Sequence, residues 1–176
     1  METGSGIRNL KLSVADGKVY EARANMGTPQ YLEPRQLPMR EYVFTFTPVS
    51  MGNPHAVMFL EPKRTAGAAI EELPMWEIGP YFETHASSNE RVNAEFVEVM
   101  DEHTLRMRVW ERGSGETMAC GTGACAAAVA AIVGERVEGN TVTVELRGGR
   151  LRIEWDRETN TVFMTGPAET VFSGEI

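Results

Sequence analysis

The sequence predicts an α+β fold in which mostly antiparallel strands form a barrel-like roll around one buried apolar helix. Short runs rich in β-branched and aromatic residues, separated by turn residues, recur along most of the chain. The segment 119–133 is dominated by alanine and has no charged side chain, and a helix without a polar face belongs inside a protein. With 176 residues, 42% of them hydrophobic, the chain can bury one core.

The first part of the chain predicts a β meander. Strands are expected at residues 10–14, 19–24, 42–49 and 57–60. Asp16-Gly17 separates the first two runs and is a strong hairpin signal. The stretch that contains Pro29, Pro34 and Pro38 is expected to be an extended connector.

The second part adds helices and further strands. A short surface helix is expected over residues 66–73, ending at Pro74, and Gly79-Pro80 predicts a break after it. The buried helix covers 119–133 and should end near Gly134. Strands, the first two with one solvent-facing side each, are expected at residues 92–99, 105–110, 141–146, 151–155 and 162–165.

The charge of the chain argues against nucleic acid as a partner. Lys and Arg number 17 against 25 Asp and Glu, so the net charge is −8, and there is no basic run to bind phosphates. No stretch approaches the roughly 20 apolar residues of a membrane-spanning helix. The first residues also lack the basic and apolar regions of a secretory signal, so we expect a cytoplasmic protein.

The two cysteines, Cys120 and Cys125, are expected to be unpaired. On one helix they lie about 7.5 Å apart along the axis and about 140° apart around it, so Cys125 is assigned to the core. Cys120 falls at the helix start, where unpaired amides favour a thiolate, and the amides of Gly121 and Thr122 could hold a carboxylate beside it. Packing remains the alternative role, because a free cysteine is commonly just buried.

Two further clusters carry less information alone. Gly52-Asn53-Pro54-His55 could be an ordinary turn, and the Asn of Arg91-Val92-Asn93 could simply begin a strand. The residues around Gly121 lack the lysine and the spacing of a phosphate loop, and the Cys and His residues have no zinc-ligand spacing, so no metal site is predicted.

Taken together, the motifs resemble the diaminopimelate epimerases. The resemblance rests on Met51–Val57, Arg91–Val97, Glu111–Gly123 and Met164–Ala168, in this order. It implies the fold of that family and interconversion of LL- and meso-diaminopimelate, a precursor of lysine and the cell wall. It also implies a mechanism that uses two cysteines and no pyridoxal phosphate or other cofactor, on a small diamino dicarboxylic acid.

The resemblance assigns a role to each matching residue. Cys120 matches the second catalytic cysteine, and His55 and Glu111 match groups around the catalytic sulfurs. Gly121 and Thr122 match the backbone donors for the reacting carboxylate. The residues that match those holding the distal amino-acid end of the substrate are Asn53, Asn93, Glu111 and Arg112.

One feature of the family is missing. The chain has no Cys-Gly-Asn-Gly motif, which carries the family's first catalytic cysteine, so it resembles a C-terminal half. We therefore expect residues 1–27 to be the end of an N-terminal domain or its linker, and 28–176 to be the epimerase-like domain. The other catalytic cysteine would come from an N-terminal half-domain or from a second copy in a homodimer. The alternative is a non-catalytic binding or structural module derived from the epimerase fold.

Overall fold

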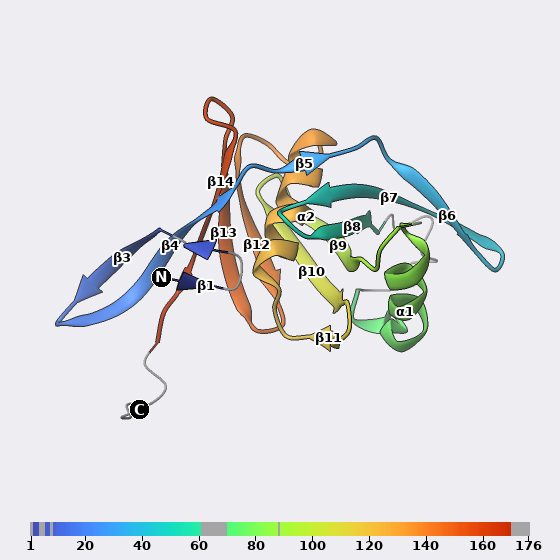
Figure 1. The fold of residues 1–176 in the computed structure, drawn as a ribbon, viewed down its shortest axis with the longest axis horizontal. Coiled ribbons are helices and arrows are strands. Elements are labelled where there is room, and N and C mark those ends of the chain that lie inside the picture. Colours follow the sequence, from blue (N-terminus) through green and yellow to red (C-terminus); the bar gives the residue numbers. More distant parts are fainter. Residues whose placement is uncertain (1, 4–5, 8, 61–69, 88, 170–176) are drawn as a thin grey trace.

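A computed structural model describes residues 2–3, 6–7, 9–60, 70–87 and 89–169 (Figure 1). The helical elements are η1 (Ile70–Glu72), α1 (Met75–His85) and α2 (Gly121–Val133). The strands are β1 (Glu2–Thr3), β2 (Gly6–Ile7), β3 (Leu10–Ala15), β4 (Lys18–Gly27), β5 (Gln30–Tyr31), β6 (Arg35–Met39), β7 (Tyr42–Ser50), β8 (Pro54–Phe59), β9 (Asn93–Asp101), β10 (Thr104–Glu111), β11 (Gly115–Thr117), β12 (Thr141–Leu146), β13 (Gly149–Asp156) and β14 (Thr161–Pro167).

Twelve of the strands form one mixed sheet. Its order is β3-β4-β14-β13-β12-β10-β9-β8-β7-β5, with β11 beside β10 and β6 beside β7. The pairs β10–β12 and β8–β9 are parallel, and the other pairs in this sheet are antiparallel. The predicted α+β roll is confirmed, but as an open one: in the described part of the chain the end strands β3 and β5 do not pair to close a barrel.

Helix α2 lies inside the roll, as its composition predicts. Its residues 123–131 are all buried, and it contacts strands on both arms of the curved sheet, from β7 and β8 to β13 and β14 (Figure 1). Alanine side chains let the strands approach the helix axis closely, and the core around it includes Val57, Leu105 and Ile153. The helix ends at Gly134, where the sequence predicts its end.

The predicted break at Gly79-Pro80 is wrong, because α1 continues through both residues. Gly79 lies against Trp110, and a Cβ atom placed on Gly79 would overlap the Trp110 ring. Gly79 is needed for close packing of α1 against the sheet, and it does not end the helix. Pro80 removes one helical hydrogen bond and crowds the preceding turn. The helix continues despite this cost because its buried face is packed, around the fully buried Phe82.

Two other predicted segments differ from the structure. The stretch with Pro29, Pro34 and Pro38 is extended, but part of it is the strand β6. In the described residues β6 pairs only with β7, so it is an edge strand, where proline is best tolerated. The helix predicted over 66–73 lies partly outside the described residues; the described part contains only the 3₁₀ turn η1.

The β3–β4 hairpin confirms the turn at Asp16-Gly17. Both residues have positive φ, 50° and 73°, as the favoured two-residue hairpin turn requires. The hairpin projects from the body (Figure 1), while β4 also pairs antiparallel with β14. Strands β3 and β4 are therefore continuous with the main sheet, whereas β1 and β2 pair with each other. The division at residue 27 stays a prediction.

Strand β9 is buried on both faces over its first five residues, although one solvent-facing side was predicted for it. The reason is tertiary: Val97 packs in the core around α2, while Ala94 and Phe96 pack in a second core with α1. The start of β9 is therefore shielded on both sides, and any polar side chain there needs a partner inside the protein.

Candidate active site

Strand alternation directs the candidate side chains to the face that carries α2. Val57, Val97 and Val109 pack against α2 from β8, β9 and β10. Residues two or four positions away point to the same face. The polar side chains that share this face are His55, Asn93, Glu95 and Glu111. His55 and Asn93 are also direct neighbours in the parallel β8–β9 pair.

Cys120 is the N-cap of α2, with an extended backbone at φ −135° and ψ 111°. Its Sγ accepts a hydrogen bond from the Gly123 amide at 3.4 Å and lies 3.6 Å from Thr122 Oγ1. Gly123 has no room for a side chain, since a Cβ would lie 2.8 Å from Glu95 Oε1 and 3.2 Å from Cys120 Sγ. The glycine thus lets the Glu95 carboxylate approach the first turn of α2 next to the sulfur.

The predicted thiolate at Cys120 is not what the structure favours. Burial, with the residue only 7% exposed, raises the pKa of the Cys120 thiol to about 11. The hydrogen bonds from Thr122 and Gly123 lower this pKa, and the charges of Glu95 and Glu111 raise it. The helix start does supply donors to the sulfur, but loss of water outweighs them, so Cys120 is a thiol at neutral pH.

Glu95 is a site residue that the sequence analysis missed. Its Oε1 lies 2.7 Å from Nδ1 of His55, and both side chains are fully buried. Glu95 Oε2 is also buried and has no hydrogen-bond partner in the described residues. The available signal was its position: it alternates with Asn93 and Val97 on the core face of a strand, where a carboxylate is uncommon.

Asn53 connects this pair to the helix start. Its Oδ1 lies 3.0 Å from Nε2 of His55, and its Nδ2 donates to Thr122 Oγ1 at 3.3 Å. The turn before it is made at Gly52, whose φ of +94° suits glycine. The structure therefore brings Asn53, His55, Thr122 and Cys120 together from two distant parts of the chain.

Asn93, Glu111 and Arg112 form a neighbouring group. Asn93 Oδ1 accepts a hydrogen bond from the Arg112 amide at 3.0 Å, and Glu111 accepts one from the Thr117 hydroxyl. The Arg112 guanidinium is 42% exposed and lies 3.6 Å from Glu90. Glu111 links this group to the first one electrostatically, because its charge raises the pKa of the Cys120 thiol.

A second missed residue, Glu83 of α1, holds the loop after β10. Its carboxylate accepts hydrogen bonds from Trp110 Nε1 at 2.7 Å and from the Gly113 amide at 3.1 Å. Glu83 is 7% exposed. It fixes the turn that follows Glu111 and Arg112 from the opposite face of the sheet.

The start of α2 has amide donors of the kind that bind anions. The first amides of a helix have no intrahelical acceptor, and that of Gly123 is taken by Cys120 Sγ. The amides of Gly121 and Thr122 are thus the ones that can face a carboxylate. Gly121 also has a packing role, because a Cβ there would lie 3.0 Å from Met164 Sδ.

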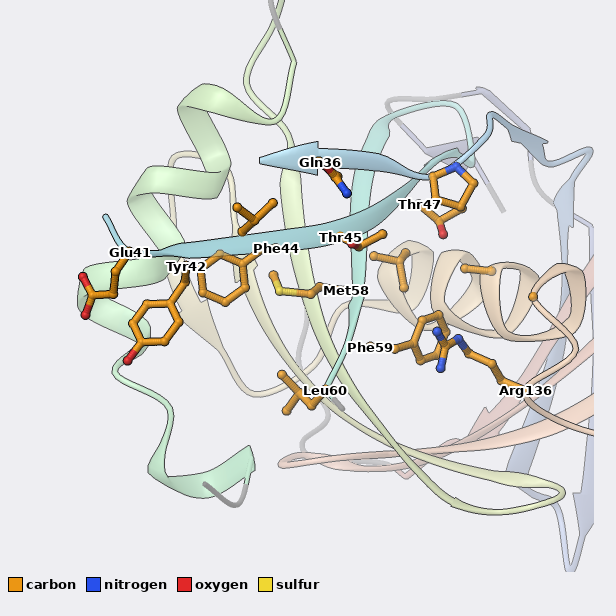
Figure 2. Close-up of a pocket in the computed structure, with 15 residues that line it drawn as sticks. Gln36, Glu41, Tyr42, Phe44, Thr45, Thr47, Met58, Phe59, Leu60 and Arg136 are labelled. Carbon is orange, nitrogen blue, oxygen red and sulfur yellow. The ribbon is translucent and has the colours of Figure 1, made fainter. Parts of the chain in front are cut away.

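The cavity shown in Figure 2, of about 660 Å³, lies elsewhere, between β7, β8 and the end of α2. Its wall mixes apolar and aromatic side chains with polar ones, and in it the Arg136 guanidinium lies 4.4 Å from the centre of the Phe59 ring. A smaller cavity of about 230 Å³ borders His55. Among the residues that the structure describes, no group of three or more His, Cys, Asp and Glu is placed to hold a metal ion. No helix in this part of the chain is long and apolar enough to cross a membrane.

Comparison of the sequence with known families identifies one match. A family model described as diaminopimelate epimerase matches residues 47–171. A diaminopimelate epimerase of Methanococcus maripaludis is 44% identical over 190 residues, covering 100% of this chain and 65% of the relative. That of Acetivibrio thermocellus is 45% identical with the same coverage, and that of Bacillus cereus is 43% identical, covering 99% and 63%. The chain thus spans about 65% of the length of such relatives.

Solved structures with the same fold include an epimerase and a probable racemase. A hydroxyproline epimerase from Agrobacterium vitis superposes with a TM-score of 0.67 at 16% identity, covering 94% of this chain and 55% of that one. A probable proline racemase from Agrobacterium radiobacter gives 0.68 at 12% identity, covering 98% and 59%. At these identities the likeness shows the fold alone, and it confirms the predicted epimerase-like architecture.

Proposed function

This chain belongs to the diaminopimelate epimerase family, and we propose that it forms one wall of the active site of a cofactor-independent amino-acid epimerase. The reaction we propose is the interconversion of LL- and meso-diaminopimelate, which serves lysine and cell-wall precursor synthesis. The observation that carries the proposal is a buried thiol at the N-cap of a helix, beside the amides of Gly121 and Thr122.

In the proposed reaction, Cys120 transfers the proton on its own face of the substrate. The substrate carboxylate binds at the start of α2, where the amides and the helix dipole stabilise the negative charge that develops as the α-proton leaves. A base on the opposite face removes that proton, and the Cys120 S–H bond breaks as its proton reaches the α-carbon. The sulfur is left as a thiolate, which is the base in the reverse direction. A thiol that stays protonated at neutral pH suits the donor role.

The group on the opposite face is not supplied by the second cysteine of this chain. Cys125 is fully buried within α2, and burial raises the pKa of its thiol to about 12. We propose that an N-terminal half-domain provides this group. A second copy of the chain is the alternative source, and in either arrangement we place the protein in the cytoplasm.

The distal amino-acid end of the substrate is proposed to bind the second group of residues. The half-exposed Arg112 guanidinium presents two donors to a carboxylate, and its loop is held by Asn93 and Glu83. Glu111 is the acceptor for the ammonium group. Asn53 uses one Nδ2 hydrogen and its Oδ1 within the protein, so its second Nδ2 hydrogen is the one available to the substrate.

A non-catalytic binding module is the second candidate function. The observation that favours it is the raised pKa of Cys120, because a buried thiol of this kind is also what simple packing would produce. The two candidates differ in one measurable property, which is exchange of the substrate α-proton.

The test is complementation with an N-terminal half-domain. This chain is mixed with the separately expressed N-terminal half of a relative, and deuterium entry at the α-carbon of LL-diaminopimelate is followed in deuterated water. We expect exchange with the unaltered chain and with Cys125→Ala, and loss of exchange with Cys120→Ala. Binding of diaminopimelate without exchange in any mixture would instead support the module.

A further inference from the structure

A continuous chain of hydrogen-bonding groups joins a buried carboxylate to the sulfur of Cys120. The successive distances are 2.7 Å from Glu95 Oε1 to His55 Nδ1, 3.0 Å from His55 Nε2 to Asn53 Oδ1, 3.3 Å from Asn53 Nδ2 to Thr122 Oγ1, and 3.6 Å from Thr122 Oγ1 to Cys120 Sγ. Glu95, His55 and Cys120 are buried, and Asn53 and Thr122 are half-buried. Both ends of this chain of groups are therefore shielded from water, and only its middle members, Asn53 and Thr122, are partly exposed.

The chemistry of the groups sets the direction of each hydrogen bond. An amide oxygen only accepts, so His55 Nε2 carries the hydrogen that it directs at Asn53. The other ring nitrogen, Nδ1, shares a proton with the Glu95 carboxylate. With its Oδ1 facing His55, Asn53 must turn its Nδ2 to Thr122, which therefore accepts.

Thr122 is consequently left with one hydrogen to donate, and Cys120 Sγ is the acceptor beside it. We propose that Thr122 is a positioning residue whose side-chain hydroxyl stabilises the Cys120 thiolate formed by proton transfer. Asn53, His55 and Glu95 hold this hydroxyl in its donating orientation. The inference deepens the proposed function, which uses only the backbone of Thr122. It names Glu95 as the anchor of the chain.

The electrostatics of the sulfur agree with this geometry. Among the groups that lower the pKa of Cys120, the Thr122 hydroxyl has the larger effect and the Gly123 amide the smaller. The Glu95 charge itself raises that pKa, so the carboxylate cannot help the thiolate directly. Its contribution is to orient the chain of donors that ends at Thr122.

The experiment measures the reactivity of Cys120 in this chain without any need for turnover. The rate of alkylation of Cys120 by iodoacetamide is followed at several pH values below the pKa of the thiol, with peptide-resolved mass spectrometry to separate Cys120 from Cys125. Two variants are compared: Thr122→Val, which has the same shape without a hydroxyl, and Thr122→Ser, which keeps the hydroxyl. Thermal unfolding shows that each variant is folded.

We expect Thr122→Val to slow alkylation about threefold to fourfold. Loss of a hydrogen bond to the thiolate should raise the pKa of Cys120 by about one unit, which lowers the thiolate fraction about tenfold. The greater nucleophilicity of a more basic thiolate offsets about 2.5-fold to threefold of that loss. Thr122→Ser should stay within about twofold of the unaltered chain. Equal rates for the valine variant and the unaltered chain would overturn the proposal.

A second comparison tests the orienting role of Asn53. Asn53→Asp places a group that only accepts beside Thr122, so the hydroxyl turns away from Cys120. The added negative charge also raises the pKa of the Cys120 thiol. We expect Asn53→Asp to slow alkylation less in a Thr122→Val background than in the unaltered chain, because only the charge effect remains there. Equal slowing in both backgrounds would refute the orienting role. Neither result depends on exchange of a substrate proton, so failure of the proposed reaction is distinguishable.

Discussion

Glu95 Oε1 lies 2.7 Å from Nδ1 of His55, with both side chains fully shielded from solvent. The two residues come from the parallel strands β8 and β9 and are diagonal neighbours on the face that carries α2. A buried pair of this kind contributes little net stability when intact, but removing one partner leaves a polar group buried without compensation. The other carboxylate oxygen, Oε2, already lacks a partner in the described residues, so the pair is sensitive to any change at His55.

The first prediction concerns this pair. Glu95→Ala should lower the free energy of unfolding by about 3 kcal/mol or more, because it strands the buried imidazole and leaves a cavity. His55→Ala should cost less in the Glu95→Ala background than in the unaltered chain, since the partner is already gone. Urea unfolding of the two single variants and the double variant measures the coupling. Additive free energies would show that the residues do not act as a pair.

The second prediction concerns the first turn of α2. Gly123→Ala should destabilise the protein by about 1–3 kcal/mol, although alanine favours helix, because its Cβ would press on Glu95 Oε1 and Cys120 Sγ. Gly121→Ala is the matched control, two residues earlier. There the nearest atom is Sδ of Met164 at 3.0 Å, at the end of a side chain that can move, so a smaller loss is expected. Chemical denaturation checks both, and equal losses would contradict the packing argument.

The third prediction tests why α1 continues through a glycine and a proline. Gly79→Ala should cost about 2 kcal/mol or more, because its Cβ would overlap the Trp110 ring, which is held by the hydrogen bond to Glu83. Thr84→Ala, at an exposed position of the same helix, should change stability by less than about 1 kcal/mol. The two variants are compared by their thermal unfolding temperatures. A mild effect at Gly79 would mean that Trp110 can move aside.

The fourth prediction is a loss of stability at alkaline pH. The pKa of Cys120 rises from 9.0 for an accessible thiol to about 11 in the folded protein, and that of Cys125 to about 12, in both cases chiefly because burial disfavours the thiolate. Between these values the unfolded chain has lost a proton that the folded chain retains. The free energy of unfolding therefore keeps its full contribution from each thiol below about pH 9. It loses that contribution as pH rises toward 11 for Cys120 and toward 12 for Cys125.

The expected slope is about 1.4 kcal/mol per pH unit for each thiol in this range. Urea unfolding at a series of pH values measures it, and Cys125→Ala should remove the contribution of one thiol. A free energy of unfolding with the same pH dependence in that variant would contradict the assignment.

Most of the fold could be predicted from local sequence. The alanine-rich segment before Gly134, the turn at Asp16-Gly17 and the alternating strands all depend on residues close together in the chain, so composition and spacing predict them. The continuity of α1 could not be predicted in this way. It depends on contact between Gly79 and Trp110, which are 31 positions apart, and from nearby residues alone Gly79-Pro80 is typical of a break.

The candidate site divides in the same manner. Motifs in the sequence identified Asn53, His55 and Cys120, and the sequence by itself also determined that the thiol stands at the start of an apolar helix. Only the tertiary structure decided that this thiol is protonated and that Glu95 lies beside it. The physical reason is that protonation depends on how much water the surrounding strands exclude and which charges they bring near, and both are set by parts of the chain that meet only when it folds.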